Sequence, residues 1–155
     1  MEKFRSTFER VLESVVIVLT ASLTMLVVVA VVFRKAGGAL VWYDEVASIL
    51  LAWLTYYGSA YAALKRGHIG FAAVVERFPP SVRQATERVS TVVVISFFAL
   101  TAYAGWRVVL VLGGTTLVSL PWMPTIVAQS VIPIGAVLFI VAELLNLRPH
   151  DEAAP

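Results

Sequence analysis

Residues 14–33 read SVVIVLTASLTMLVVVAVVF, a run of 20 positions without a charged side chain. A hydrocarbon core about 30 Å thick needs roughly 20 apolar residues for one α-helix to cross it, so this stretch predicts a transmembrane helix. Further uncharged runs cover Val46–Leu64, Val89–Trp106 and Val108–Ala142. Of the 155 residues, 14% are charged and 59% hydrophobic. Because soluble domains carry about 25% charged residues, the chain is predicted to be an integral membrane protein.

The spacing of these runs predicts an all-α integral membrane protein with four transmembrane helices and a short amphipathic segment between the second and third. We expect one membrane domain over residues 1–155, with helices at about 11–33, 42–64, 88–112 and 123–145 and the amphipathic segment at about 70–78. A cleaved signal peptide is the alternative reading of the first helix, but its apolar region would span about 7 to 15 residues. Pro133 lacks an N–H and predicts a kink in the fourth helix.

Basic residues are distributed unevenly between the two sides of the predicted helices. One side carries nine Lys and Arg residues: three before the first helix, five between the second and third, and Arg148. The other side carries three: Arg34, Lys35 and Arg107. Since cytoplasmic loops are enriched in Lys and Arg, both termini are predicted to be cytoplasmic.

Several kinds of chemistry lack their usual residues in this chain. Without cysteine there is no disulfide, thiolate nucleophile or cysteine-bound metal. The three lysines do not lie in a glycine-rich phosphate loop, and His68 and His150 lie outside the apolar runs, which disfavours a haem-bearing anchor of a respiratory enzyme. The net charge of +2 comes from basic residues at helix ends, which indicates orientation signals rather than nucleic-acid binding. We expect no enzymatic activity, no catalytic or substrate-binding residue, no metal and no cofactor.

Ion-coupled transport usually leaves an ionisable residue deep in the membrane, because such residues are costly and are kept for function. Here Asp44, Glu45, Arg107 and Glu143 are expected at the rims of the helices. The small multidrug-resistance transporters also have four helices, but they carry a carboxylate in the first, and residues 14–33 contain none. A homo-oligomeric ion-coupled transporter or channel is therefore the alternative to a subunit that transports nothing by itself.

The second predicted helix has two different faces when its residues are placed at 100° intervals. We expect the first face to bind a partner protein, because it has aromatic residues far from the membrane surface. Its residues are Trp42, Glu45, Ile49, Trp53, Tyr56 and Ala60. Small residues let helices approach closely in lipid, so we expect the second face to pack inside the chain's own bundle. That face carries Ser48, Ala52, Thr55, Ser59 and Ala62.

Two groups of short motifs resemble the small membrane subunit of tripartite ATP-independent periplasmic (TRAP) transporters, the DctQ-like family. The first group opens and closes the second helix: Trp42-Tyr43-Asp44-Glu45, Trp53, Gly58 and Arg66-Gly67-His68-Ile69. The second leads into the fourth helix: Ser119-Leu120-Pro121-Trp122 and Ile132-Pro133-Ile134-Gly135. Ser48 stands where many relatives have arginine, and Gly70-Phe71 stands where an acidic residue is expected, so charge pairing at these two positions is not carried over.

The resemblance implies a small scaffold subunit in the bacterial inner membrane without a substrate site of its own. Its implied partners are a large DctM-like membrane subunit, which moves substrate by a sodium-driven elevator mechanism, and a periplasmic substrate-binding protein. The implied substrates are organic acids. No nucleic-acid partner is implied, and the lipid bilayer is the surrounding solvent.

Overall fold

The computed structural model describes residues 2–65 and 79–147 of the chain. In this part the regular structure is helical, apart from one isolated β-bridge between Thr116 and Pro124. The helices are α1 (Glu2–Lys35), α2 (Tyr43–Leu64), α4 (Pro80–Val111), α5 (Thr125–Gln129) and α6 (Val131–Asn146). Four segments are long and apolar enough to cross a membrane: Lys3–Lys35, Tyr43–Leu64, Val82–Val111 and Thr125–Asn146. The predicted all-α membrane fold is confirmed.

Two helices begin well before the apolar runs that predicted them. α1 starts at Glu2 rather than near residue 11, and α4 starts at Pro80 rather than near residue 88. Proline at the first position of a helix has a suitable φ and loses no hydrogen bond, which explains the start of α4. Glu and Arg are good helix formers, so both α1 and α4 can begin in charged sequence that precedes their apolar runs. The predicted amphipathic segment at residues 70–78 lies outside the described residues.

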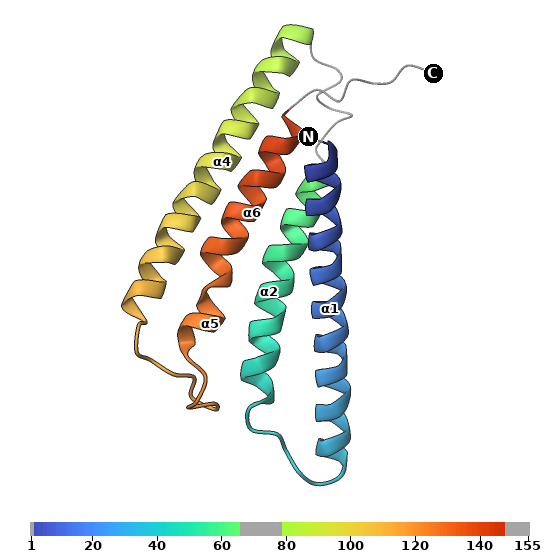
Figure 1. Cartoon of the computed structure of the whole chain (residues 1–155), viewed down its shortest axis with the longest axis vertical. Coiled ribbons are helices and arrows are strands. Elements are labelled where there is room, and N and C mark those ends of the chain that lie inside the picture. The colour runs from blue at the N-terminus through green and yellow to red at the C-terminus, as the bar shows by residue number, and fades with distance from the viewer. Residues whose placement is uncertain (1, 66–78, 148–155) are drawn as a thin grey trace.

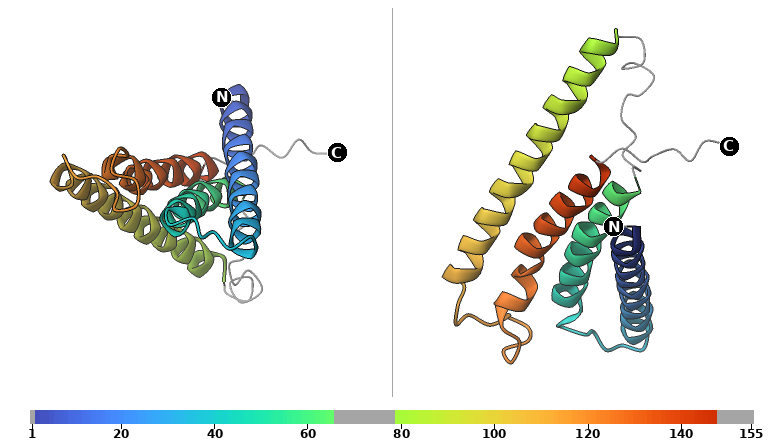
Figure 2. Two further views of the ribbon diagram at one scale, coloured as in Figure 1. Left: turned by 90° about the horizontal axis from the view of Figure 1, so that it is seen from below. Right: turned by 45° about the horizontal axis from the view of Figure 1, so that its top comes forward.

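The four spans lie side by side in the order α1, α2, α6, α4 (Figures 1 and 2). α2 packs against α1 on one side and α6 on the other, and α6 also packs against α4. We call the end with the start of α1 and the ends of α2 and α6 the terminal end. The opposite end, with the connections at 36–42 and 112–124, is the loop end. The central position of α2 and α6 makes their contact the main determinant of the packing.

The last span is interrupted near its loop end. α5 ends at Gln129 and α6 starts at Val131, with Ser130 between them. Pro133 has no N–H, so the carbonyl of Gln129 lacks the donor that a continuous helix would provide four residues later. The kink predicted at Pro133 therefore takes the form of a break, and the helix expected over 123–145 consists of two pieces.

Close helix contacts depend on two glycines. A Cβ atom at Gly135 of α6 would lie 2.6 Å from the Cβ of Tyr56 in α2. A Cβ at Gly105 of α4 would lie 2.7 Å from a methyl carbon of Ile132 and 3.0 Å from Cδ of Pro133. Both distances are below normal carbon–carbon contact, about 3.5–4.0 Å. The absence of a side chain at these positions is what allows α2, α6 and α4 to approach one another.

The buried core lies toward the terminal end and joins three helices. Phe139 of α6 stacks on Phe98 of α4 with ring centroids 3.8 Å apart. The fully enclosed members of this core come from α1, α2 and α6: Leu12, Ala60, Ala63, Leu64, Phe139 and Ala142. Outside this core many large apolar side chains are exposed, as is expected of a surface that faces lipid or another apolar protein surface, although Leu19, Leu117 and Val131 are also buried.

Candidate functional site

One face of α2 is directed toward α5, α6 and the connection that precedes α5. Three of the residues predicted on the first face, Glu45, Trp53 and Tyr56, each contact a different part of this region. Ala60, one helical turn further on, is completely buried. The face that the sequence assigned to a partner protein is therefore used within the chain.

Glu45 holds the 112–124 connection at the loop end of α2. Its carboxylate accepts the backbone N–H of Val118 at 3.1 Å and that of Ser119 at 2.7 Å. The connection is also bonded to itself, because the N–H of Leu117 donates to the carbonyl of Met123 at 3.0 Å. Hydrogen bonds from backbone N–H groups to an ionised carboxylate are stronger than those between neutral groups. Glu45 thus orders a connection whose apolar Val118 side chain is almost fully exposed.

Trp53 lies against the break between α5 and α6. Its indole Nε1–H donates to the carbonyl oxygen of Ala128, 3.4 Å away. This carbonyl belongs to the last turn of α5, where the interruption of the helix leaves backbone oxygens without their usual donors. In lipid an unsatisfied backbone group is costly, so the indole supplies a donor where the backbone does not.

The other two residues predicted on this face, Trp42 and Ile49, are half-buried. Trp42 precedes α2 and lines an open groove along α1, together with Ser22 and Met25. Within the part of the chain that the structure describes, neither side chain forms a hydrogen bond to another helix or connection, as those of Glu45 and Trp53 do.

The second predicted face does not form the centre of the helix packing, and this corrects the sequence interpretation. Ser48 and Thr55 are exposed, and each hydroxyl donates to a carbonyl of its own helix, at 2.7 and 2.8 Å. Ser59 is half-buried and donates to the carbonyl of Tyr56 at 2.9 Å; Ala52 and Ala62 are also half-buried. Close approach is permitted instead by Gly135 of α6, where α6 packs on α2, and by Gly105 of α4, where α4 packs on α6.

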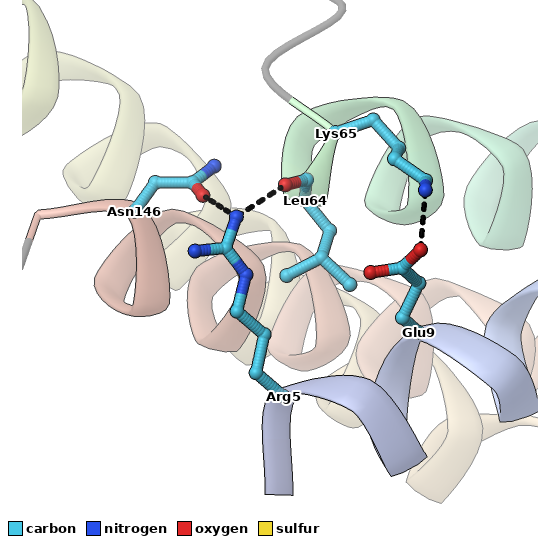
Figure 3. Close-up of polar contacts among 5 residues, drawn as sticks. All are labelled: Arg5, Glu9, Leu64, Lys65 and Asn146. Carbon is cyan, nitrogen blue, oxygen red and sulfur yellow. Dashed lines mark hydrogen bonds and ion pairs between the residues drawn. The ribbon is translucent and has the colours of Figure 1, made fainter. Parts of the chain in front are cut away.

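A polar cluster joins three helices at the terminal end (Figure 3). The side-chain amide of Asn146 donates to the carbonyl of Ala63 at 2.6 Å, and Arg5 donates to the carbonyl of Leu64 and to Asn146 Oδ1, both at 3.5 Å. The last carbonyls of a helix lack internal partners and carry its negative dipole end, so donors and cations are favourable there. Arg5 and Asn146 thus cap α2 from α1 and α6.

Lys65 continues this cluster on its exposed side. Its ammonium group forms an ion pair with the Glu9 carboxylate (Figure 3). The hydrogen bond that Lys65 donates to the Glu9 carboxylate raises the pKa of Lys65 above its ordinary value of 10.5. Because an exposed ion pair contributes little to stability, the main role of this link is to orient the start of α1 against the end of α2.

The described surface offers little that resembles a site for a charged small molecule. Among the described residues no three His, Cys, Asp or Glu side chains come close enough to hold a metal ion. Besides the groove at Trp42, a second open groove lies along the first turns of α4, lined by Val82, Ala85 and Val89. Both grooves are open and largely apolar, which suits lipid or protein contacts better than an organic acid.

Three residues that organise the fold, Arg5, Asn146 and Gly105, were not given a role from the sequence, and Gly135 was quoted in a motif without its packing role. The glycines had a usable signal, since a glycine within an apolar helix often marks a close helix contact. Asn146 at the end of an apolar run was a weaker signal, because a polar residue there is also typical of a solvated helix end.

Comparison with known proteins gives one informative result. No curated protein matches the chain. A family model described as "Tripartite ATP-independent periplasmic transporters, DctQ component" matches residues 23–150, most of the sequence.

Proposed function

The chain belongs to the DctQ component family of tripartite ATP-independent periplasmic transporters, and from this premise we propose that it is the small scaffold subunit of a bacterial uptake system. In this proposal it supports a large DctM-like subunit in the inner membrane. That subunit carries out sodium-driven uptake of an organic acid delivered by a periplasmic binding protein. The match over residues 23–150 is the observation on which the proposal rests.

The distribution of charge supports a scaffold rather than a self-sufficient transporter. Among the described acidic residues, Glu2, Glu9 and Glu13 lie in about the first third of α1, Asp44 and Glu45 in the first turn of α2, Glu87 near the start of α4, and Glu143 one turn before the end of α6. Glu45 is already engaged in holding a connection of its own chain. Ion-coupled transport needs a titratable or ion-coordinating group along the path, and these positions do not supply one at mid-helix.

We further propose that the loop end faces the periplasm and the terminal end the cytoplasm, in accordance with the nine-to-three distribution of Lys and Arg. Because the natural chain has no cysteine, single cysteines report orientation without interference. In intact cells a membrane-impermeant thiol reagent should label Gly38→Cys and leave Ser6→Cys unlabelled. Labelling with the reverse pattern contradicts this orientation.

The proposed function is tested in two steps. The tagged chain, purified from membranes of its native host, should carry with it a much larger multi-span membrane protein of the same transporter, identified by mass spectrometry. The purified chain alone, reconstituted into liposomes, should show no sodium- or proton-driven uptake of C4-dicarboxylates, keto acids or sialic acids. Flux through the chain alone would favour the homo-oligomeric transporter instead.

A further inference from the structure

α4 has one packed face and one uncovered face. It packs mainly against α6 through positions such as Phe98 and Gly105, and slightly against α5. At 100° per residue, the opposite face carries Leu100, Tyr103 and Arg107. Leu100 is 69% exposed and Tyr103 61%, so the chain itself does not cover this face.

Arg107 lies one helical turn before the end of α4 at Val111, but this end of α4 is set back from the loop end relative to the start of α2. Gly105 is level with Ile132, and Gly135 is level with Tyr56 of α2. We count 1.5 Å per residue along α2 from Tyr43 to Tyr56, back toward the loop end along α6 from Gly135 to Ile132, and further toward it along α4 from Gly105 to Arg107. On this count Arg107 is roughly 12 Å further from the loop end than the start of α2. Figure 1 shows the same offset: α4 extends beyond the other helices at the terminal end and stops short of α2 at the loop end.

The guanidinium group is also directed away from the loop end. Its Nη1 donates to the phenol oxygen of Tyr103, 3.2 Å away and one helical turn toward the terminal end. Between Arg107 and the loop end the helix exposes Leu110 and Val111, 59% and 77%. Arg107 is thus a cation surrounded by exposed apolar side chains on the uncovered face of α4.

A guanidinium has five N–H donors, and one phenol oxygen accepts only one of them. In the part of the chain that the structure describes, Arg107 forms no ion pair. Charged residues in membrane segments are expensive and normally pair with another group, and a carboxylate can accept two parallel bonds from arginine. The chemistry that complements this surface is therefore a carboxylate in apolar surroundings.

We propose that Arg107, oriented by Tyr103, binds an Asp or Glu side chain on a transmembrane segment of the large membrane subunit, which packs along the uncovered face of α4. This inference rests on the proposed function, because it takes the large subunit as the partner. It replaces the α2 face, which the chain uses for its own packing, as the surface for that partner.

The first test compares variants by recovery of the large subunit in co-purification at matched expression. Arg107→Gln should weaken association at least tenfold, equivalent to about 1.4 kcal/mol, and Tyr103→Phe should weaken it less. Arg34→Gln, at the exposed loop end of α1, is the matched control and should leave recovery unchanged. If the natural chain recovers no large subunit, the proposed function fails; if it does and Arg107→Gln recovers equally, only this inference fails.

The second test does not require a variant at Arg107 to fold. A benzophenone attached to Leu100→Cys should cross-link to the large subunit in assembled complexes, while the same probe at Val28→Cys on α1 should not. The cross-linked segment should be a transmembrane segment carrying Asp or Glu; a segment without either would overturn the proposal. The phospholipid bound per purified complex should be the same for Arg107→Gln. Loss of bound lipid with unchanged recovery would identify a lipid phosphate as the ligand and overturn the proposal.

Discussion

Gly135→Ala is expected to destabilise the folded chain by forcing α2 and α6 apart. The added methyl would lie 2.6, 2.8 and 2.9 Å from Cβ, Cδ1 and Cγ of Tyr56. Rotation of the Tyr56 side chain cannot relieve the closest contact, because Cβ is attached directly to the backbone. The two helices must therefore shift by about 1 Å to restore a normal separation of about 3.5–4.0 Å. Overpacking of this kind costs about 1–3 kcal/mol.

Gly58→Ala is the matched control, since it is the same substitution on α2 with nothing within 4 Å of the new Cβ. Alanine favours a helix over glycine by about 0.8–1.0 kcal/mol, and this gain applies to both variants. It cancels in their comparison, which leaves the overpacking cost. Gly105→Ala should also be less stable than Gly58→Ala, because its new Cβ would lie 2.7 Å from Cγ2 of Ile132 and 3.1 Å from the backbone nitrogen of Pro133, which side-chain rotation cannot move.

The measurement is reversible unfolding in mixed detergent micelles, followed by the fluorescence of the four tryptophans. Gly135→Ala should be less stable than Gly58→Ala by about 1–3 kcal/mol, the cost expected of overpacking. Equal stability of the two variants would refute the conclusion that α2 and α6 meet closely at Tyr56 and Gly135.

The remaining predictions concern three polar contacts of α2. Trp53→Phe removes the hydrogen-bond donor to the Ala128 carbonyl but keeps an aromatic ring. It should lower the free energy of unfolding in the same micelles by about 0.5–1.5 kcal/mol. An unchanged free energy would show that the indole N–H is dispensable. Glu45→Gln keeps only one of the two acceptor oxygens that hold the 112–124 connection. Hydrogen exchange measured by mass spectrometry should therefore become faster at the amides of residues 117–119 and stay the same in α1. Unchanged exchange at residues 117–119 would mean that Glu45 does not order this connection. The raised pKa of Lys65 means that its ion pair with Glu9 stabilises the fold fully below pH 10.5, and this stabilisation is lost as the pH rises through the raised value. The stability difference between the natural chain and Lys65→Gln should therefore be constant at neutral pH and decline in strong alkali; a difference that grows with pH would contradict this sign.

The spans and the break in the last one were accessible from the sequence because they depend on local chemistry. A run such as 14–33 must cross a membrane as a helix, since lipid offers no partner for unsatisfied backbone groups. Pro133 removes a donor wherever it stands in a helix, so a disturbance near it was predictable. The early starts of α1 and α4 were missed because charged helical turns carry no apolar signal.

The contacts that the two α2 faces make within the chain differ from those expected, and the reason lies in the pairing of surfaces. Trp53 and Tyr56 were assigned to a partner because they are deep and aromatic, and Ser48 and Thr55 to internal packing because they are small. In lipid neither property decides the matter, because an aromatic face packs closely when its neighbour supplies a glycine, as Gly135 does for Tyr56.

The sequence by itself therefore determined that this is a four-span membrane protein and to which family it belongs, because apolar length, turn residues and motif order are properties of the chain alone. The tertiary structure decided which surfaces the chain uses for itself and which it leaves uncovered. That outcome depends on the register of α2 against α6 and on the offset of α4 along α6. Both are set by contacts between residues far apart in sequence, such as Tyr56 with Gly135 and Asn146 with Ala63, and no single helix contains that information.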